Sequence, residues 1–263
     1  MRALDTAATG MKSQQLFMDT VSNNLANVNT TGYKMQRVEF KDLLYQQLQP
    51  SNFSAGVGKP VNLEVGHGVA LNAIVRDFGK GNLQQTNNNL DTAIDGEGFY
   101  AVRDAQNNMF YTKDGGFKLS VEGTSSKLVN SEGDYLQGNG GDITLGEDVK
   151  EITIDKTGLV SVKRGSSTTN EDIDTLRLVR FANPAGLESV GSNLLKATAA
   201  SGDPTENTDG TNGSVLQGYL ETSNVQVVDE MIKLITAQRA YEINSKAIQT
   251  ADSMLEMADN LKR

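Results

Sequence analysis

The chain has 263 residues, with 24 Lys and Arg against 33 Asp and Glu, which gives a formal net charge of -9. So acidic a chain repels phosphate backbones, and general nucleic-acid binding is therefore not expected. Cysteine is absent and His67 is the single histidine, which excludes disulfides, thiolate chemistry and multi-histidine metal sites.

The first residues carry no pattern of a cleaved export signal. Asp5 and Lys12 interrupt the apolar core that such a signal needs. No segment reaches the roughly 18 apolar residues of a membrane span. We therefore expect that, if the protein leaves the cytoplasm, it does so without a cleaved signal peptide.

A long helix is predicted over residues 4–28. Its seam residues recur at alternating steps of three and four, which is the heptad spacing of helices that pack side by side. The seam comprises Leu4, Ala7, Met11, Gln14, Met18, Val21, Leu25 and Val28, of which Gln14 is polar. The turn-forming run 27–32, NVNTTG, predicts an abrupt end to the helix.

A second long helix is predicted over residues 224–262, which contain neither glycine nor proline. Ser223 or Asn224 is the expected cap, and Asp229 and Glu230 suit the positive end of the helix dipole. The seam here comprises Leu234, Ala237, Tyr241, Asn244, Ile248, Ala251, Leu255 and Ala258, and Met231, Ile235 and Met254 widen it.

Residues 56–218 have a different sequence pattern from the two predicted helices. Short apolar runs at 99–102, 151–154, 159–162 and 176–181 lie between clusters of Gly, Asn and Asp, which predicts strands joined by tight turns. Residues 200–214 are predicted to form a flexible loop. The predicted fold is therefore α+β, with long N- and C-terminal helices pairing as a coiled-coil-like core and a β-rich middle domain. The pattern leaves open whether the seams are buried within one chain or against neighbouring copies.

The run Gly96 to Ala101 fits the loose G-x-G-x-x-A nucleotide fingerprint. That fingerprint needs a helix after the glycines, but a predicted strand follows here, so a β-turn is favoured. Asp91, Asp95 and Glu97 lie close enough in sequence to suggest the carboxylate pair of a glycosidase. Neighbouring acids are common in an acidic chain, and solvated side chains are the favoured interpretation.

Two further candidates are weak. Residues 203–214 fit a calcium loop only in part, through Thr205, Asn207, Asp209 and Gly210, because Leu216 stands where a bidentate Glu is needed. His67 lies between two glycines and is interpreted as a turn residue. We therefore expect no catalytic, cofactor-binding or metal site and no bound cofactor.

Several motifs resemble the signatures of the flagellar rod–hook family. The family's N-terminal signature is similar to residues 7–11 (AATGM) and 22–34 (SNNLANVNTTGYK). Its central signature is similar to residues 81–86 (GNLQQT) and 93–99 (AIDGEGF). Its C-terminal signature is similar to residues 220–225 (LETSNV) and 235–247 (ITAQRAYEINSKA). The chain length and the extended stretch that follows Phe40 to Gln46 resemble the rod members more than the hook members, which generally carry a larger insertion.

The resemblance implies a structural subunit of the flagellar axis and no enzyme activity. It implies export through the flagellar type III apparatus and assembly into a helical homopolymer in the basal body, in the periplasm or cell-wall zone. Proximal rod and hook subunits, a rod cap and surrounding ring proteins would be its neighbours. Residues 1–45 and 220–263 would form the inner tube, 46–66 an extended stiffening segment, and 67–219 a β-rich outer domain.

The residues predicted at the subunit interface come from both seams and from the asparagine-rich end of the first helix. They are Leu4, Met11, Met18, Val21, Asn24, Leu25, Asn27, Leu234, Tyr241, Asn244, Ile248 and Leu255. Without neighbours to bury them, residues 1–30 and 224–263 are expected to be partly disordered in the free subunit. The alternatives are a sibling axial subunit, a secreted binding module, and an enzyme acting on cell-wall glycan through the acids at 91–97.

Overall fold

A computed structural model describes residues 2–49, 52–54, 57–59, 62–122, 125–146, 149–165, 170–206 and 213–261. Backbone contacts divide the chain into two compact units. The helical unit comprises Met1–Ala26, Gln36–Arg76 and Gln226–Arg263, and the β unit comprises Asn27–Met35 and Asp77–Val225. The fold is therefore α+β, as predicted. Within the described ranges, no helix has the length and apolar character needed to cross a membrane.

The helical unit is built on α1 (Arg2–Ala26) and α2 (Val227–Asn260). Both predicted helices are confirmed, and α1 ends where the turn-forming run begins. The prediction that Ser223 or Asn224 caps α2 is wrong, because the cap residue is Gln226 and its side chain makes no capping hydrogen bond. The Asn224 carboxamide instead accepts from the Met35 amide and donates to the Asp77 carbonyl, and so helps to hold together the β unit.

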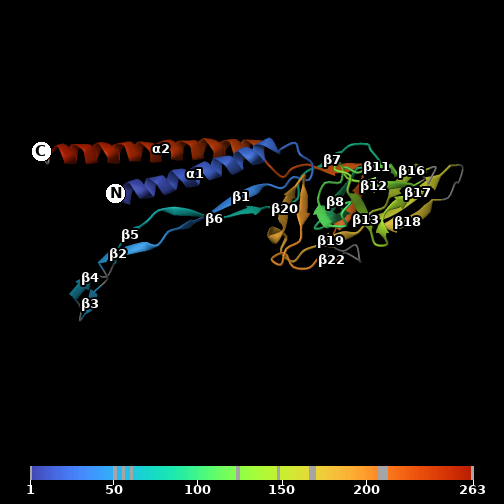
Figure 1. Ribbon diagram of the computed structural model, residues 1–263, viewed down its shortest axis with the longest axis horizontal. Helices are drawn as coiled ribbons and strands as arrows, with labels where there is room; N and C mark the ends of the chain where they lie inside the picture. The colour runs from blue at the N-terminus through green and yellow to red at the C-terminus, as the bar shows by residue number, and fades with distance from the viewer. Residues whose placement is uncertain are drawn as a thin grey trace. The chain divides into compact units, whose positions relative to one another are not determined.

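The two helices run antiparallel and approach closely. The Asn24 amide group donates to Glu230 Oε2 at 3.0 Å near one end of the contact. Further along, a Cβ placed on Gly10 would lie 2.9 Å from Asn244 Nδ2, so the absence of a side chain lets the helices come together. Because α2 has 34 residues against 25 in α1, its C-terminal turns continue past the start of α1, as Figure 1 shows.

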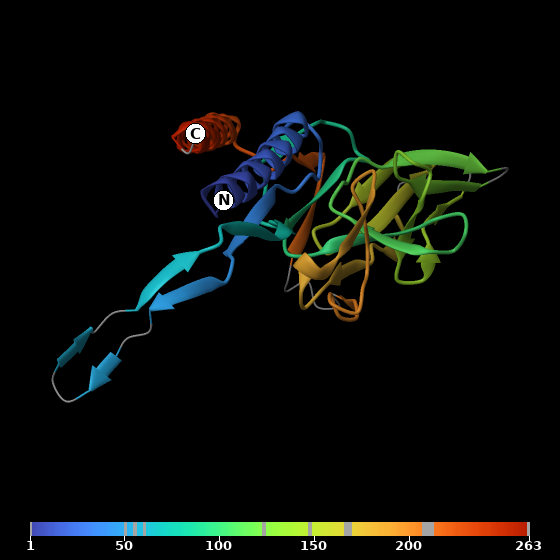
Figure 2. The same cartoon turned by 60° about the vertical axis from the view of Figure 1, so that its left-hand side comes forward.

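A two-stranded ribbon completes the helical unit. It comprises β1 (Gln36–Asp42), β2 (Tyr45–Gln49), β3 (Asn52–Ser54), β4 (Val57–Lys59), β5 (Leu63–Gly66) and β6 (Val69–Arg76). The antiparallel pairs β1–β6, β2–β5 and β3–β4 follow one another along it (Figure 2). Near α1 the ribbon is anchored by packing, because the rings of Phe17 and Phe40 meet edge to face at 6.0 Å.

The β unit contains short strands and a single 3-10 turn, η1 (Pro184–Gly186), among its described residues. The strands are β7 (Leu83–Gln85), β8 (Thr92–Gly96), β9 (Phe99–Arg103), β10 (Met109–Thr112), β11 (Lys118–Glu122), β12 (Ser125–Val129), β13 (Tyr135–Gly138), β14 (Gly141–Asp142), β15 (Thr144–Leu145), β16 (Val149–Ile154), β17 (Leu159–Arg164), β18 (Glu171–Thr175), β19 (Leu178–Arg180), β20 (Glu188–Gly191), β21 (Leu194–Lys196), β22 (Thr205–Glu206), β23 (Gly213–Gln217) and β24 (Tyr219–Glu221).

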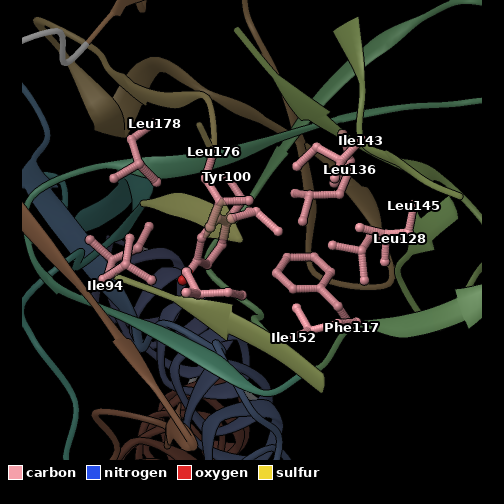
Figure 3. Close-up of a cluster of buried hydrophobic side chains, with 14 of the residues drawn as sticks. Ile94, Tyr100, Phe117, Leu128, Leu136, Ile143, Leu145, Ile152, Leu176 and Leu178 are labelled. Atoms are coloured by element: carbon pink, nitrogen blue, oxygen red, sulfur yellow. The ribbon is translucent and has the colours of Figure 1, made fainter. Parts of the chain in front are cut away.

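The main sheet of the β unit has the order β11-β12-β13-β9-β10-β21-β20, and a smaller sheet has the order β16-β17-β18. Their apolar side chains meet in one core around Tyr100, whose ring packs edge to face on Phe117 at 5.2 Å (Figure 3). Burial raises the pKa of the Tyr100 hydroxyl well above its usual value, because the phenolate would lose its hydration.

Three of the four predicted strands are confirmed as β9, β16 and β17. The fourth, predicted over 176–181, is shorter: β19 comprises Leu178–Arg180, and Leu176 forms an isolated bridge with Gly138. The predicted loop over 200–214 also contains the first residues of β23 and the short strand β22, while residues 207–212 lie outside the described ranges. Clusters of Gly, Asn and Asp therefore placed β9, β16 and β17 to within two residues at each end, and the other strands of the β unit were not predicted individually apart from β19.

Candidate subunit interface

The predicted seam of α1 lies on the side of the helix that is at least half-buried. Ala7 and Val21 are buried, and the remaining seam residues of α1 are half-buried: Leu4, Met11, Gln14, Met18 and Leu25. The seam therefore finds much of its cover within the chain.

The predicted seam of α2 is covered unevenly. Ala237 and Ala251 are buried, and Leu234, Asn244 and Ile248 are half-buried. Tyr241 and Leu255, by contrast, are 38% and 41% exposed. The in-chain contact with α1 therefore leaves part of this seam open, most of all toward the C-terminus.

Large apolar side chains also cover the opposite side of α2, which we call the outer α2 face. It consists of Val228, Met231, Ile232, Ile235, Ile243, Met254, Met257 and Leu261, each at least 49% exposed. Of this set, only Met231, Ile235 and Met254 belong to the stripe predicted from the sequence. The missed signal was a second apolar series, at 228, 232 and 235, one helical face away from the seam.

Asn24 joins three elements of the helical unit. Its carboxamide oxygen accepts from the Gln36 amide at 2.9 Å, and its nitrogen donates to the Gln36 carbonyl at 2.8 Å and to Glu230. Glu230 is 1% exposed and also accepts from Lys233 Nζ at 2.6 Å. The predicted interface residue Asn24 is thus buried and bonded inside its own chain, at the start of β1.

Asn27, also predicted at the interface, lies in the turn after α1. It is half-buried, and its side-chain oxygen accepts from the Thr30 hydroxyl at 3.2 Å. This bond matches the local role that asparagine commonly takes in turns.

The ribbon exposes apolar side chains along much of its length. Those at least 36% exposed are Phe40, Leu44, Tyr45, Leu48, Leu63, Val65 and Ile74. A two-stranded ribbon has no second layer of its own to cover such residues. The ribbon and the outer α2 face together expose many large apolar side chains on the helical unit. Such a number exceeds the single exposed apolar residues that are normal on a protein surface.

Three of the signature motifs meet at one buried ion pair of the β unit. Lys34 Nζ donates to Glu221 Oε1 at 2.7 Å and to the Gly79 carbonyl at 2.7 Å. The Gly81 amide donates to the same Glu221 oxygen at 2.8 Å. A side chain on Gly81 would collide with the Thr222 carbonyl, which explains the glycine. We call these residues the signature junction, and it was not predicted from the sequence.

The acids considered for catalysis do not form a site. Asp95 pairs with Lys80 at 2.6 Å and Glu97 pairs with Arg180 at 2.6 Å, both at the surface. Asp91 accepts from the Asn88 side chain at 2.9 Å. Each carboxylate thus has its own partner, and the geometry does not assemble the pair of opposed acids that glycoside hydrolysis needs.

The glycine motif at 96–101 is a turn between strands. Gly96 and Gly98 have positive φ values of 133° and 143°, and β9 follows them directly. A strand and not a helix N-terminus follows the glycines, as predicted, so no phosphate site forms there; Glu97 lies in a bend between β8 and β9.

The remaining candidates carry no metal chemistry in the parts that the structure describes. His67 is exposed between β5 and β6. Of the calcium-like residues, Thr205 lies in β22 and Leu216 in β23, while Asn207, Asp209 and Gly210 lie outside the described ranges. Within those ranges no three acidic or histidine side chains gather where they could hold a metal ion.

Three family profiles match successive parts of the chain. Residues 4–34 match "Flagella basal body rod protein", 93–162 match "Flagellar hook protein FlgE/F/G D1 domain", and 216–261 match "Flagellar basal body rod FlgEFG protein C-terminal". The outer two matches contain the predicted signatures at 22–34 and 235–247, and the middle one contains 93–99.

Full-length relatives share the same description. The chain is 45% identical to the flagellar basal-body rod protein FlgG of Borreliella burgdorferi, with 100% of this chain and 99% of the relative aligned. It is 42% identical to the FlgG proteins of Caulobacter vibrioides and Agrobacterium fabrum, each over 100% of both chains. The chain therefore belongs to the family of FlgG flagellar basal-body rod proteins, and is a structural subunit of the flagellar rod rather than an enzyme.

Proposed function

We propose that the chain is the subunit of the distal part of the rod, and that it self-assembles into a rigid tube that transmits motor torque to the hook. The terminal helices form the inner layer of this tube and the β-rich middle forms its outer layer. Residues 46–66 act as the stiffening segment. Residues 1–45 and 220–263 belong to the inner layer, and residues 67–219 belong to the outer layer.

The observation that carries the proposal is the outer α2 face. Its members are at least 49% exposed in the single chain, although they recur at helical spacing along one element. Exposed apolar surface of this extent normally marks a site of protein contact, because leaving it in water forfeits about 25 cal/mol per Å². Neighbouring copies would cover it when the subunits assemble.

Pairing of the two seams supports the same assembly. The heptad spacing of both helices and their antiparallel approach at Gly10 and Asn24 fit a coiled-coil-like core. With α1 on the seam side, α2 keeps its outer face free for other copies. The helical layer is then stabilised by seam residues of both helices, with Asn24 and Asn27 at its end. These seam residues are Leu4, Met11, Met18, Val21, Leu25, Leu234, Tyr241, Asn244, Ile248 and Leu255.

The ribbon supports the stiffening role. Its exposed apolar side chains, such as Leu44 and Leu63, lack a covering layer within the chain. Contacts with adjacent subunits would both cover them and restrict sliding between copies. A tube held by helices and ribbons together resists torsion better than one held by helices alone.

The remaining partners follow from a place in the rod. Proximal rod and hook subunits adjoin the tube at its ends, a rod cap guides addition, and ring proteins surround it in the periplasm or cell-wall zone. The subunit reaches its position through the flagellar type III export apparatus. None of these contacts requires a cofactor.

Electron microscopy of the concentrated protein, seeded with rod fragments, tests the proposal. Straight tubes are the expected product. Curved, flexible filaments would instead favour a hook-type sibling, and a protein that stays monomeric on authentic seeds would contradict self-assembly. A variant that lacks the residues of α2 from Ser253 onward serves as control, because it removes Met254 and Met257 but keeps the helical turns that lie beside α1; it should fail to extend the seeds.

A further inference from the structure

The β unit contains a pocket of about 460 Å³ beside the end of β19. Its apolar part includes Phe78, Phe99 and Phe181, and its charged residues are Lys113, Arg180 and Glu97. The three rings form an edge-to-face series, with centroids 5.3 Å apart for Phe78–Phe99 and 5.9 Å for Phe99–Phe181. Apolar walls with a few charged groups are typical of a site that binds one side chain or a small ligand.

Lys113 is the unusual group in this pocket. It is 6% exposed, its Nζ donates to the Gly96 carbonyl at 3.1 Å, and it lies 5.6 Å from the centre of the Phe99 ring. Burial lowers the pKa of Lys113 to about 8, because the ammonium has lost much of its hydration. Among the described residues its direct contacts are thus neutral ones, a carbonyl and a ring.

The acid in the pocket does not form an ion pair with Lys113. Glu97 Oε2 lies 2.6 Å from Arg180 Nη2, in a pair that is exposed on both sides. The pocket lining thus carries two cations and one carboxylate, in a chain whose net charge is -9. A buried cation without a carboxylate is costly, and a docking carboxylate would offset that cost.

We propose that this pocket receives a carboxylate, carried next to an apolar side chain, from a second copy of the chain. The inference rests on the proposed self-assembly, which brings copies together. A second copy fits because the chain has 33 acidic residues against 24 basic ones. The apolar neighbour packs on the phenylalanine rings while the carboxylate pairs with Lys113. Because the copies assemble into a polymer, the contact is head-to-tail and continues from copy to copy.

Carbodiimide cross-linking tests the contact directly, since it joins a lysine amine only to a carboxylate that touches it. Basal bodies isolated from cells and the dilute monomer are treated in parallel, and the peptides linked to Lys113 are identified by mass spectrometry. We expect a link to a carboxylate of the same protein that occurs in the basal bodies and not in the monomer. Links found equally in the monomer, links to a different protein, or no link at Lys113 would overturn the proposal.

A competition experiment measures the effect on assembly. Cells produce the wild-type chain and the Lys113→Met variant in equal amounts, and their ratio in isolated basal bodies is measured. We expect the wild type to exceed the variant about tenfold or more, because truncating one member of a buried charge pair weakens a complex strongly. Equal incorporation would overturn the proposal, and absence of both chains from basal bodies would overturn the proposed function as well.

Two controls separate a docking role from a structural one. Lys80→Met removes an exposed lysine that pairs with Asp95 in the same unit, and should be incorporated like the wild type. The thermal midpoint of the free Lys113→Met subunit should be unchanged or raised, since a poorly hydrated charge is replaced by an apolar chain of similar length. A lowered midpoint with normal incorporation of the folded fraction would assign Lys113 to folding alone and overturn the proposal.

Discussion

Lys34 and Glu221 lie 187 positions apart in sequence, yet their charged atoms are 2.7 Å apart and their side chains are 2% and 1% exposed. Lys34 closes the N-terminal signature and Glu221 lies in the C-terminal one. Gly81, at the start of the central signature, supplies the remaining amide, and Gly79, two residues before that signature, supplies the carbonyl. Motifs that are separate in the sequence therefore form one buried polar junction.

Removing one partner of this junction should destabilise the β unit. We expect Lys34→Met to lower its free energy of unfolding by about 3–5 kcal/mol, because Glu221 is left as an uncompensated buried charge. Urea titration followed by hydrogen exchange of the β24 amides measures the loss. The double variant Lys34→Met with Glu221→Gln should recover part of it. Lys80→Met, at an exposed pair, should cost about 0–1 kcal/mol, and a similar loss at both lysines would contradict the argument.

The Asn24 network should control how α1, β1 and α2 are joined. Asn24→Ala leaves the Gln36 amide and carbonyl and the buried Glu230 without this partner, and each such group costs about 1–3 kcal/mol. The higher helix propensity of alanine returns only about 0.5 kcal/mol. We expect faster hydrogen exchange at the Gln36 amide. Gln15→Ala, which removes an exposed carboxamide from the same helix, should leave that exchange unchanged.

The outer α2 face should be needed for assembly and not for folding of the subunit. Ile235→Glu with Ile243→Glu places two charges at positions that are 56% and 66% exposed in the single chain. The circular dichroism of the free subunit should therefore stay the same, while seeded tube growth is lost. Gln238→Glu adds a charge elsewhere on the exposed surface of α2 and should permit growth. Normal tubes from the double variant would show that this face does not meet other copies.

The stability of the β unit should rise with pH because of Lys113. Its pKa is about 8 in the folded chain, against 10.5 ordinarily, so between these values the unfolded chain binds more protons than the folded one. Stability therefore increases from about pH 8 to 10.5, by about 1.4 kcal/mol per unit of pKa difference. Burial is the main cause of the lowered pKa of Lys113. The negative charges of Glu221 and Glu97 act to raise this pKa, and the positive charges of Lys34 and Lys80 lower it further.

The comparison of wild type with Lys113→Met isolates that effect from other titrating groups. Chemical denaturation at pH 7.5, 9 and 10.5 gives the two stability curves. The difference between variant and wild type should shrink as the pH rises, because the wild type loses its unfavourable charge. A difference that stays constant with pH would show that Lys113 keeps an ordinary pKa in the folded chain.

The spacing of apolar residues was sufficient to predict the two helices, because an amphipathic period extends over many residues and its ends carry turn-forming signals. Glycine and asparagine clusters likewise marked β9, β16 and β17. The start of α2 was predicted too early for a reason that local pattern does not contain. Asn224 is a good capping residue in isolation, but it is held by Met35 and Asp77, far away in the chain.

By itself, the sequence determined the fold class, the absence of cysteine chemistry and the family resemblance, since composition, period and contiguous motifs are local properties. Tertiary structure decided which seam residues are covered, why Lys34, Gly81 and Glu221 belong together, and that Asn24 bonds within its own chain. It also decided that Lys113 lies buried against Phe99 without an ion pair among the described residues. The physical reason is that burial and charge pairing depend on residues brought together from distant parts of the chain, which no local window of sequence contains.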